Sequence, residues 1–247
     1  RMRVAPLIIN HHLQPLDTLY TASTTEKASV DFRADLSKAI SATKSGKLIQ
    51  IPMYDQWTQD LFETGWMSMP AAGGKQHVIT VWLRSANVDL PSSPLAPLRA
   101  GGRLVYQVRG PDIAAVQQYD RKHALSMDTL NSLGNLEVVP PHDHGGKSYP
   151  LGRIIMGNVS TFYPTKSFTT LLSSQAVQTP IWIDTSWLYV AHTDETMTFI
   201  KTSSKRGWAL VLNAATLART MLQDAPKAGH GAVTMSEGKY WLNARNT

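Results

Sequence analysis

The 247-residue sequence contains no cysteine. That absence excludes disulfides, thiolate metal ligands and a thiol nucleophile within this chain. The sequence also has no run of eighteen apolar residues, so we expect no segment to cross a membrane as a helix. Hydrophobic residues still make up 43% of the chain, which is enough to form a buried core.

The chain has little excess charge, and that charge is dispersed. Twenty-four Lys and Arg residues oppose eighteen Asp and Glu residues, for a net charge of +6. Nucleic-acid-binding proteins gather cations on one face because phosphate binding then releases condensed counterions. Here the densest basic segment, residues 201–206, alternates with Thr and Ser as in a solvated hairpin tip. We therefore expect no nucleic-acid partner.

Short β-type and helix-type segments alternate along the chain. The predicted strands are rich in β-branched or large apolar residues and cover residues 4–10, 47–51, 77–83, 103–108, 136–139, 153–157, 181–183, 197–201 and 209–212. The predicted helices cover residues 31–42, 167–176 and 214–223. No glycine-rich phosphate loop follows a predicted strand, so we expect an α/β chain of repeated small units rather than a doubly wound sheet.

Two short segments more than a hundred residues apart supply two carboxylates and an imidazole. They are residues 57–60 (Trp-Thr-Gln-Asp) and residues 187–195 (Trp-Leu-Tyr-Val-Ala-His-Thr-Asp-Glu). A guanidinium presents a planar fork of N–H donors that carboxylates match, which makes Asp60 and Asp194 a candidate guanidinium-binding pair. His192 is a candidate proton donor and acceptor, and in an extended segment it would share one side with Asp194.

Each of these residues also has an ordinary structural interpretation. His192 alone fits a hydrogen-bonded histidine at a strand end, and Asp60 alone fits a routine helix cap. The choice between the two interpretations depends on whether the distant segments converge.

Several motifs, read in order, resemble the protein-arginine deiminases. They are residues 55–60 (Asp-Gln-Trp-Thr-Gln-Asp), 110–112 (Gly-Pro-Asp), 134–138 (Gly-Asn-Leu-Glu-Val), 146–154 (Gly-Lys-Ser-Tyr-Pro-Leu-Gly-Arg-Ile) and 187–195. With Arg3-Val4-Ala5-Pro6 and Gly229-His230-Gly231 they keep the order of the family across nearly the whole chain. The motifs at 146–154 and 187–195 are together highly specific.

The resemblance implies a pentein fold, an α/β propeller of ββαβ modules, of which this chain would form the first half or more. Residues 1–247 would then be the N-terminal portion of one catalytic domain. The implied activity is conversion of peptidyl-arginine to peptidyl-citrulline with release of ammonia. By motif, Asp60 and Asp194 would bind the guanidinium, His192 would act as general acid and base, and Trp57 would line the substrate channel.

The nucleophile of the family is a cysteine near the C-terminal end of the catalytic domain. Its thiolate attacks the guanidinium carbon and forms a covalent thiouronium intermediate. Because this chain contains no cysteine, we expect a C-terminal segment of the same precursor as the partner that supplies it. Arginine-containing proteins or peptides are the implied substrates.

The resemblance also implies a structural calcium near the active site. The matching positions supply amide, carboxylate and backbone carbonyl oxygens, and they are Gln59, Glu63, Leu133, Leu136 and Glu137. A second calcium site of the family is not expected, because Leu61 and residues 83–87 replace its acidic motif.

Other departures from the family concern substrate and origin. Val88 stands where the family has an arginine that holds the substrate backbone, and Arg84 is the candidate to replace it. Together with the glycosylation sequon at residues 158–160, this suggests a microbial or fungal relative that is secreted or extracellular, otherwise cytoplasmic. Two alternatives stay open: a deiminase of free arginine or another small guanidine, and a catalytically inactive guanidine- or calcium-binding module.

Overall fold

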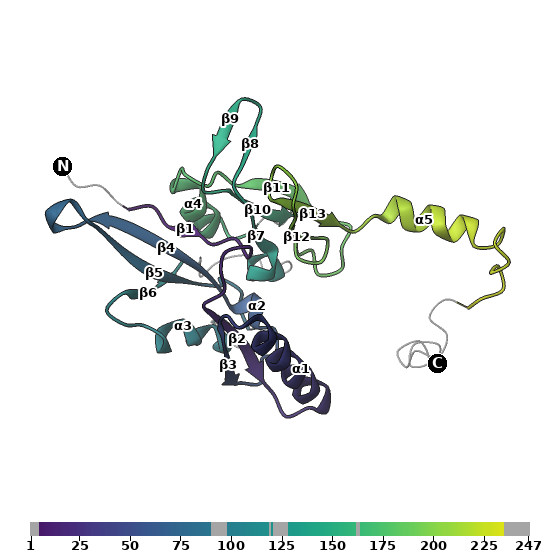
Figure 1. Ribbon diagram of the computed structural model, residues 1–247, viewed down its shortest axis with the longest axis horizontal. Coiled ribbons are helices and arrows are strands. Elements are labelled where there is room, and N and C mark those ends of the chain that lie inside the picture. The colour runs from purple at the N-terminus through teal and green to yellow at the C-terminus, as the bar shows by residue number, and fades with distance from the viewer. Residues whose placement is uncertain (1–4, 90–97, 119, 121–127, 162–163, 235–247) are drawn as a thin grey trace. The chain divides into compact units, whose positions relative to one another are not determined.

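A computed structural model describes residues 5–89, 98–118, 120, 128–161 and 164–234 (Figure 1). The chain divides into two compact units, Arg1–Val211 and Leu212–Thr247. The larger unit holds the sheets, and the smaller unit holds the helix α5 (Ala215–Asp224). In the described part of the chain, no helix combines the length and apolar character needed to span a bilayer.

Strands outnumber helices in the larger unit. The strands are β1 (Ile8–Ile9), β2 (Thr18–Ser23), β3 (Lys47–Pro52), β4 (Phe62–Pro70), β5 (Gln76–Arg84), β6 (Ile113–Gln117), β7 (Leu136–Val139), β8 (His142–His144), β9 (Lys147–Tyr149), β10 (Arg153–Asn158), β11 (Ile181–Asp184), β12 (Met197–Lys201) and β13 (Trp208–Leu212). The helices are α1 (Lys27–Thr43), α2 (Thr58–Leu61), α3 (Leu104–Gln107) and α4 (Lys166–Ser174). Short 3-10 turns are η1 (Ala72–Gly74), η2 (Ala100–Arg103), η3 (Asp128–Asn131) and η4 (Leu133–Asn135).

Two sheets share one order of elements. In the first sheet, β4 and β5 are antiparallel, α3 follows, and β6 pairs parallel to β5. In the second, β7 and β10 are antiparallel, α4 follows, and β11 pairs parallel to β10. A third group of elements is simpler and consists of the parallel strands β2 and β3, which α1 connects. The α/β class is thus confirmed, and among the described residues every sheet is open rather than closed into a ring.

An apolar core joins the two larger sheets. β1 and β5 contribute Ile9 and Leu83, and β10 contributes Met156, each at most 2% exposed. On α4, Phe168 and Leu172 lie four residues apart, so both project from one side of the helix into this core. Burial of each such side chain contributes about 1.5–3 kcal/mol. This core holds β7, and the η4 turn that precedes β7, against β5.

The expected elements are largely confirmed, with one clear error. The predicted strand at residues 103–108 is helical, because η2 and α3 occupy it. Leu104 and Val105 are buried against Trp82, a packing that a helical turn allows for adjacent residues. Of the predicted strand 4–10, only β1 forms, and Val4 lies outside the described residues. The strands β2, β4, β6, β8 and β9 were not expected.

Asn135 ties the η4 turn to the second sheet. Its side chain is fully buried, and its Nδ2 donates to the carbonyls of Leu130 (3.0 Å) and Gly157 (2.9 Å). Its Oδ1 accepts the backbone N–H of Gly157 at 2.9 Å. A Cβ at Gly157 would lie 2.5 Å from that oxygen, so only glycine permits this close approach.

We predict that Asn135→Ala lowers the free energy of unfolding by about 3 kcal/mol, because it leaves buried carbonyl and N–H groups without partners. Denaturant unfolding measures the change. Gln107→Ala, which removes an exposed amide, serves as the control and should change little. A loss below about 1 kcal/mol for Asn135→Ala would contradict this role.

Candidate active site

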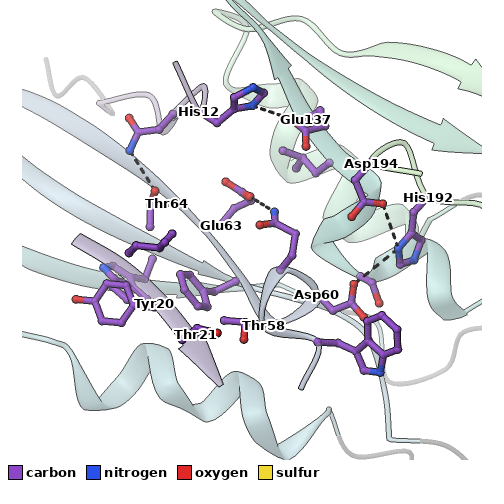
Figure 2. A pocket seen from close by; sticks show the side chains of 18 of the residues that line it. His12, Tyr20, Thr21, Thr58, Asp60, Glu63, Thr64, Glu137, His192 and Asp194 are labelled. Carbon is purple, nitrogen blue, oxygen red and sulfur yellow. Dashed lines mark hydrogen bonds and ion pairs between the residues drawn. The ribbon is translucent and has the colours of Figure 1, made fainter. Parts of the chain in front are cut away.

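A cleft of about 1690 Å³ opens in the larger unit, and the predicted site residues other than Leu133 line it (Figure 2). Asp60, His192 and Asp194 meet in this cleft, although more than 130 residues separate the first from the other two. The two distant segments therefore converge, which the sequence alone did not decide.

Asp60 is held by the short helix α2. Leu61 is fully buried next to it, and the Thr58 hydroxyl accepts the backbone N–H of Ala22 at 2.9 Å. Trp57 precedes the helix, is 63% exposed and lines the same cleft. A flat apolar ring in this place suits the wall of a channel for an aliphatic stem.

His192 and Asp194 lie in a loop, so the expectation that an extended strand aligns them is wrong. Ala191 has a positive φ of 67°, which turns the backbone before His192. The loop is fixed instead by hydrogen bonds: Asp194 N–H donates to the Gly134 carbonyl at 3.2 Å, and His192 N–H donates to Glu195 Oε1 at 2.9 Å.

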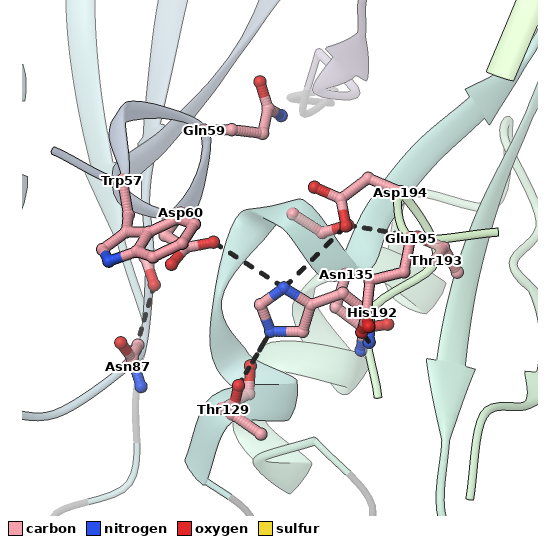
Figure 3. A network of polar contacts seen from close by, with 12 residues as sticks. Trp57, Gln59, Asp60, Asn87, Thr129, Asn135, His192, Thr193, Asp194 and Glu195 are labelled. Atoms are coloured by element: carbon pink, nitrogen blue, oxygen red, sulfur yellow. Dashed lines mark hydrogen bonds and ion pairs between the residues drawn. The ribbon is translucent and has the colours of Figure 1, made fainter. Parts of the chain in front are cut away.

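The imidazole of His192 lies between a backbone carbonyl and the two carboxylates (Figure 3). Its Nε2 is 2.8 Å from the Thr129 carbonyl, which can only accept, so Nε2 carries a proton. Its Nδ1 is 3.7 Å from Asp60 Oδ1 and 4.0 Å from Asp194 Oδ1. Nδ1 is therefore the nitrogen placed to exchange a proton with a ligand in the cleft.

The electrostatics of the site favour a bound cation. The pKa of Asp194 is raised to about 6, first by burial and then by the neighbouring Asp60, against the opposing effect of His192. Two carboxylates held close together at reduced solvation are stabilised by a positive group between them. A guanidinium carries this charge together with N–H donors for both acids.

Gly134 forms the floor of the site. A Cβ at this position would lie 2.7 Å from Asp194 Oδ2, 2.9 Å from His192 Nδ1 and 3.0 Å from Asp60 Oδ1. All three polar groups thus pack directly on the backbone of the η4 turn. A side chain at Gly134 would force them apart.

Arg99 belongs to the site and was missed in the sequence. Its Nη1 donates to Asp60 Oδ2 at 2.9 Å, while Nε and Nη2 bind both oxygens of Asp55. Arg84 was the expected cation here, but its side chain is buried and donates to Gln117 and to the Arg99 carbonyl. No local sequence pattern could have identified Arg99 as a site residue, because its position depends on the β-bridge that pairs Val88 with Leu98.

Four of the five residues expected to hold calcium, all except Leu133, line the same cleft. Gln59 Nε2 donates to Glu63 Oε1 at 2.6 Å, and Glu137 Oε2 is 3.4 Å from His12 Nδ1. Burial, together with the nearby charge of Glu137, raises the pKa of Glu63 to about 8. His12 was not among the residues expected at this site.

These residues fit a hard cation in type, but they are not assembled around one point. The Leu133 carbonyl accepts the Leu136 N–H, and Gln59 turns its N–H₂ rather than its oxygen toward Glu63. In the part of the chain that the structure describes, no group of three or more His, Cys, Asp or Glu side chains is arranged to hold a metal. A divalent cation that partly neutralised Glu63 and Glu137 would offset the repulsion between these two carboxylates.

The fold and site together define an α/β protein with an imidazole between two carboxylates. The family profile described as Protein-arginine deiminase (PAD) matches residues 1–246. The chain is 31% identical over 247 residues to protein-arginine deiminase type-4 of Homo sapiens and 30% identical over 246 residues to that of Mus musculus. It is 29% identical to the human type-1 protein over 248 residues.

The chain therefore belongs to the protein-arginine deiminase family. Each of these three alignments covers 96% of this chain and 34% of the relative, so the chain spans about a third of their length.

We predict that Gly134→Ala lowers the free energy of unfolding by about 1–3 kcal/mol, because the new methyl group overpacks three polar groups. The His192 ring resonances in NMR spectra should shift at the same time. Gly110→Ala is the control, since nothing lies within 4 Å of its Cβ position and its φ is not positive. Equal behaviour of the two variants would refute the role of Gly134.

Asp194 makes the stability of the fold depend on pH. The folded state holds the proton of Asp194 up to about pH 6, whereas the reference value for an unfolded Asp is 3.8. The unfolded state therefore binds fewer protons between these values, and stability falls as pH rises through this window.

Asp194→Asn should consequently stabilise the fold at pH 7–8 and have no such effect near pH 3.5. We expect a gain on the order of 1 kcal/mol, reduced from the full pKa shift because 36% of the side chain is exposed. Thermal unfolding at several pH values measures it, with exposed Asp143→Asn as control. A gain that does not depend on pH would contradict the assignment.

Proposed function

We propose that this chain forms part of a hydrolase that converts protein-bound arginine to citrulline and releases ammonia. The observation that carries the proposal is the convergence of Asp60, His192 and Asp194 in one cleft. Two carboxylates can hold a guanidinium from its two N–H edges, and an imidazole nitrogen faces the same space. The names of the relatives agree with this chemistry.

In the proposed reaction, a cysteine outside residues 1–247 attacks the guanidinium carbon. His192 gives the proton on Nδ1 to the departing nitrogen, which leaves as ammonia, and a thiouronium intermediate remains. His192 then takes a proton from water, and the resulting hydroxide attacks the same carbon. The C–S bond breaks with the thiolate as leaving group, and the proton of the added hydroxyl passes to solvent as citrulline forms. Asp60 and Asp194 hold the cationic substrate, and Trp57 lies along its aliphatic stem.

The cysteine would lie on a C-terminal segment of the same precursor, and residues 1–247 would be the N-terminal portion of one catalytic domain. The two repeated strand–strand–helix–strand units support a pentein-type propeller. Secretion, from the sequon at residues 158–160, and a microbial or fungal origin stay predictions.

A small-guanidine deiminase is the second candidate. Val88 is buried, and Arg84 and Arg99 bind other groups of the chain, so none of the three is placed to hold a substrate backbone. An inactive binding module is the third, and the same assay separates all three.

The assay measures citrulline from Nα-benzoyl-arginine ethyl ester, an arginine peptide and free arginine, with and without thiol alkylation. The sample is this chain combined with the cysteine-bearing segment. We predict release from the blocked substrates that alkylation abolishes, with a loss of at least about a hundredfold in Asp60→Asn but not in Asp143→Asn. Preference for free arginine would favour the second candidate, and no release from any substrate would favour the third.

We also propose that Gln59, Glu63, Glu137 and the carbonyls of Leu133 and Leu136 bind calcium. When bound, the ion would neutralise the two carboxylates and hold α2 near the η4 turn. The raised pKa of Glu63 supports the proposal, because it indicates that the surroundings of this carboxylate do not fully offset its negative charge.

Isothermal titration with Ca²⁺ tests the calcium site without reference to activity. Glu137→Gln should weaken binding on the order of tenfold or more, because it removes one of the two carboxylates. Exposed Asp143→Asn should leave binding unchanged. Absence of Ca²⁺ binding to the unaltered protein would refute the site.

A further inference from the structure

Asp60 is held from two directions by its two carboxylate oxygens. Oδ1 faces His192 Nδ1 at 3.7 Å, while Oδ2 accepts a hydrogen bond of 2.9 Å from Arg99 Nη1. A guanidinium of the chain itself thus already binds a carboxylate that the proposed function assigns to the guanidinium of the substrate.

Arg99 is rigid because its donors are shared among partners from different parts of the chain. Nε and Nη2 form a fork with the two oxygens of Asp55, at 3.0 and 2.6 Å. Nη1 also donates to Asn87 Oδ1 at 3.0 Å, and the Arg99 backbone N–H donates to the Asn87 carbonyl at 3.0 Å. With the bond to Asp60, four N–H groups of the five in a guanidinium have acceptors.

The hydrogen bonds around Arg99 also connect it to the residues that hold His192. Asn87 Nδ2 donates to the buried carboxylate of Asp128, which also accepts the Val88 N–H at 2.7 Å. The next residue, Thr129, provides the carbonyl that binds His192 Nε2. Asp60 and His192 are therefore oriented by groups that are themselves connected through Asn87 and Asp128.

We infer that Arg99 is a positioning residue for Asp60: it binds one carboxylate oxygen, so that Asp60 meets the substrate and His192 with the other oxygen alone. The inference rests on the proposed function. Rotation of the Asp60 carboxylate would break the bond to Arg99, so the orientation is set by a contact outside the substrate. The fork that holds Arg99 explains why lysine would not be equivalent.

This role has a kinetic signature. Arg99 is a fixed cation beside a cation-binding carboxylate, so it weakens the attraction of Asp60 for a second guanidinium. Its removal should strengthen or preserve substrate binding while the carboxylate loses its orientation for reaction. General damage to the site would instead weaken substrate binding.

The test compares Arg99→Gln, Arg99→Lys and the control Arg103→Gln, an exposed arginine four residues away. Citrulline release from Nα-benzoyl-arginine ethyl ester is measured for the chain combined with the cysteine-bearing segment. For Arg99→Gln we expect kcat to fall about 10- to 100-fold with KM unchanged or lower. Arg99→Lys should recover part of kcat, and Arg103→Gln should match the unaltered enzyme.

A kcat within about twofold of the unaltered value in folded Arg99→Gln, or a raised KM at constant kcat, would overturn the inference. If Arg99→Gln does not fold, Asp55→Asn provides the test, because it keeps the charge of Arg99 and removes its fork. The same loss of kcat is expected there, and an unchanged kcat would overturn the inference.

A second measurement separates this inference from the proposed function. An unaltered enzyme that releases no citrulline would contradict the function, whereas the NMR ring resonances of His192 report the position of Asp60 without turnover. They should shift in Arg99→Gln and stay constant in Arg103→Gln. An unchanged His192 spectrum in Arg99→Gln would refute the positioning role.

Discussion

The geometry of the cleft depends on the contact between the η4 turn and the loop that carries His192 and Asp194. The Gly134 carbonyl accepts hydrogen bonds from the backbone N–H of Asp194 and the hydroxyl of Thr193, and the next residue, Asn135, fastens the turn to β10. Because Gly134 has no side chain, the carboxylates and the imidazole can approach its backbone closely enough to meet. Without this contact, the three groups would be ordinary polar side chains on separate segments.

The local sequence pattern was sufficient to predict those elements whose buried side is marked by apolar residues close together in the sequence. β10 carries the apolar run Ile154–Met156 between two partner strands, and α4 carries Phe168 and Leu172 at helical spacing. The segment 103–108 failed because a short apolar run fits a strand and a helical turn equally, and packing of Leu104 and Val105 on Trp82 decides between them. β4 was missed because its nine residues are mostly half-buried and do not alternate clearly.

For the site, the sequence indicated residue types but not their arrangement. Asp60, His192 and Asp194 were identified by chemistry and by resemblance, but His192 and Asp194 lie in a loop rather than in the extended segment that would place them on one side. Arg99 carries no motif, and only tertiary contacts bring it to Asp60. Such long-range partners lie beyond any analysis of periodicity or spacing.

The most direct test of a single guanidinium-binding site is an NMR titration of this chain with Nα-benzoyl-arginine amide and, separately, with the neutral Nα-benzoyl-citrulline amide. We predict saturable shifts of the His192 ring and the Gly134 amide with the arginine ligand, and much smaller shifts with citrulline, because only the cation is stabilised between Asp60 and Asp194. Equal shifts with both ligands, or none with either at millimolar concentration, would contradict this prediction.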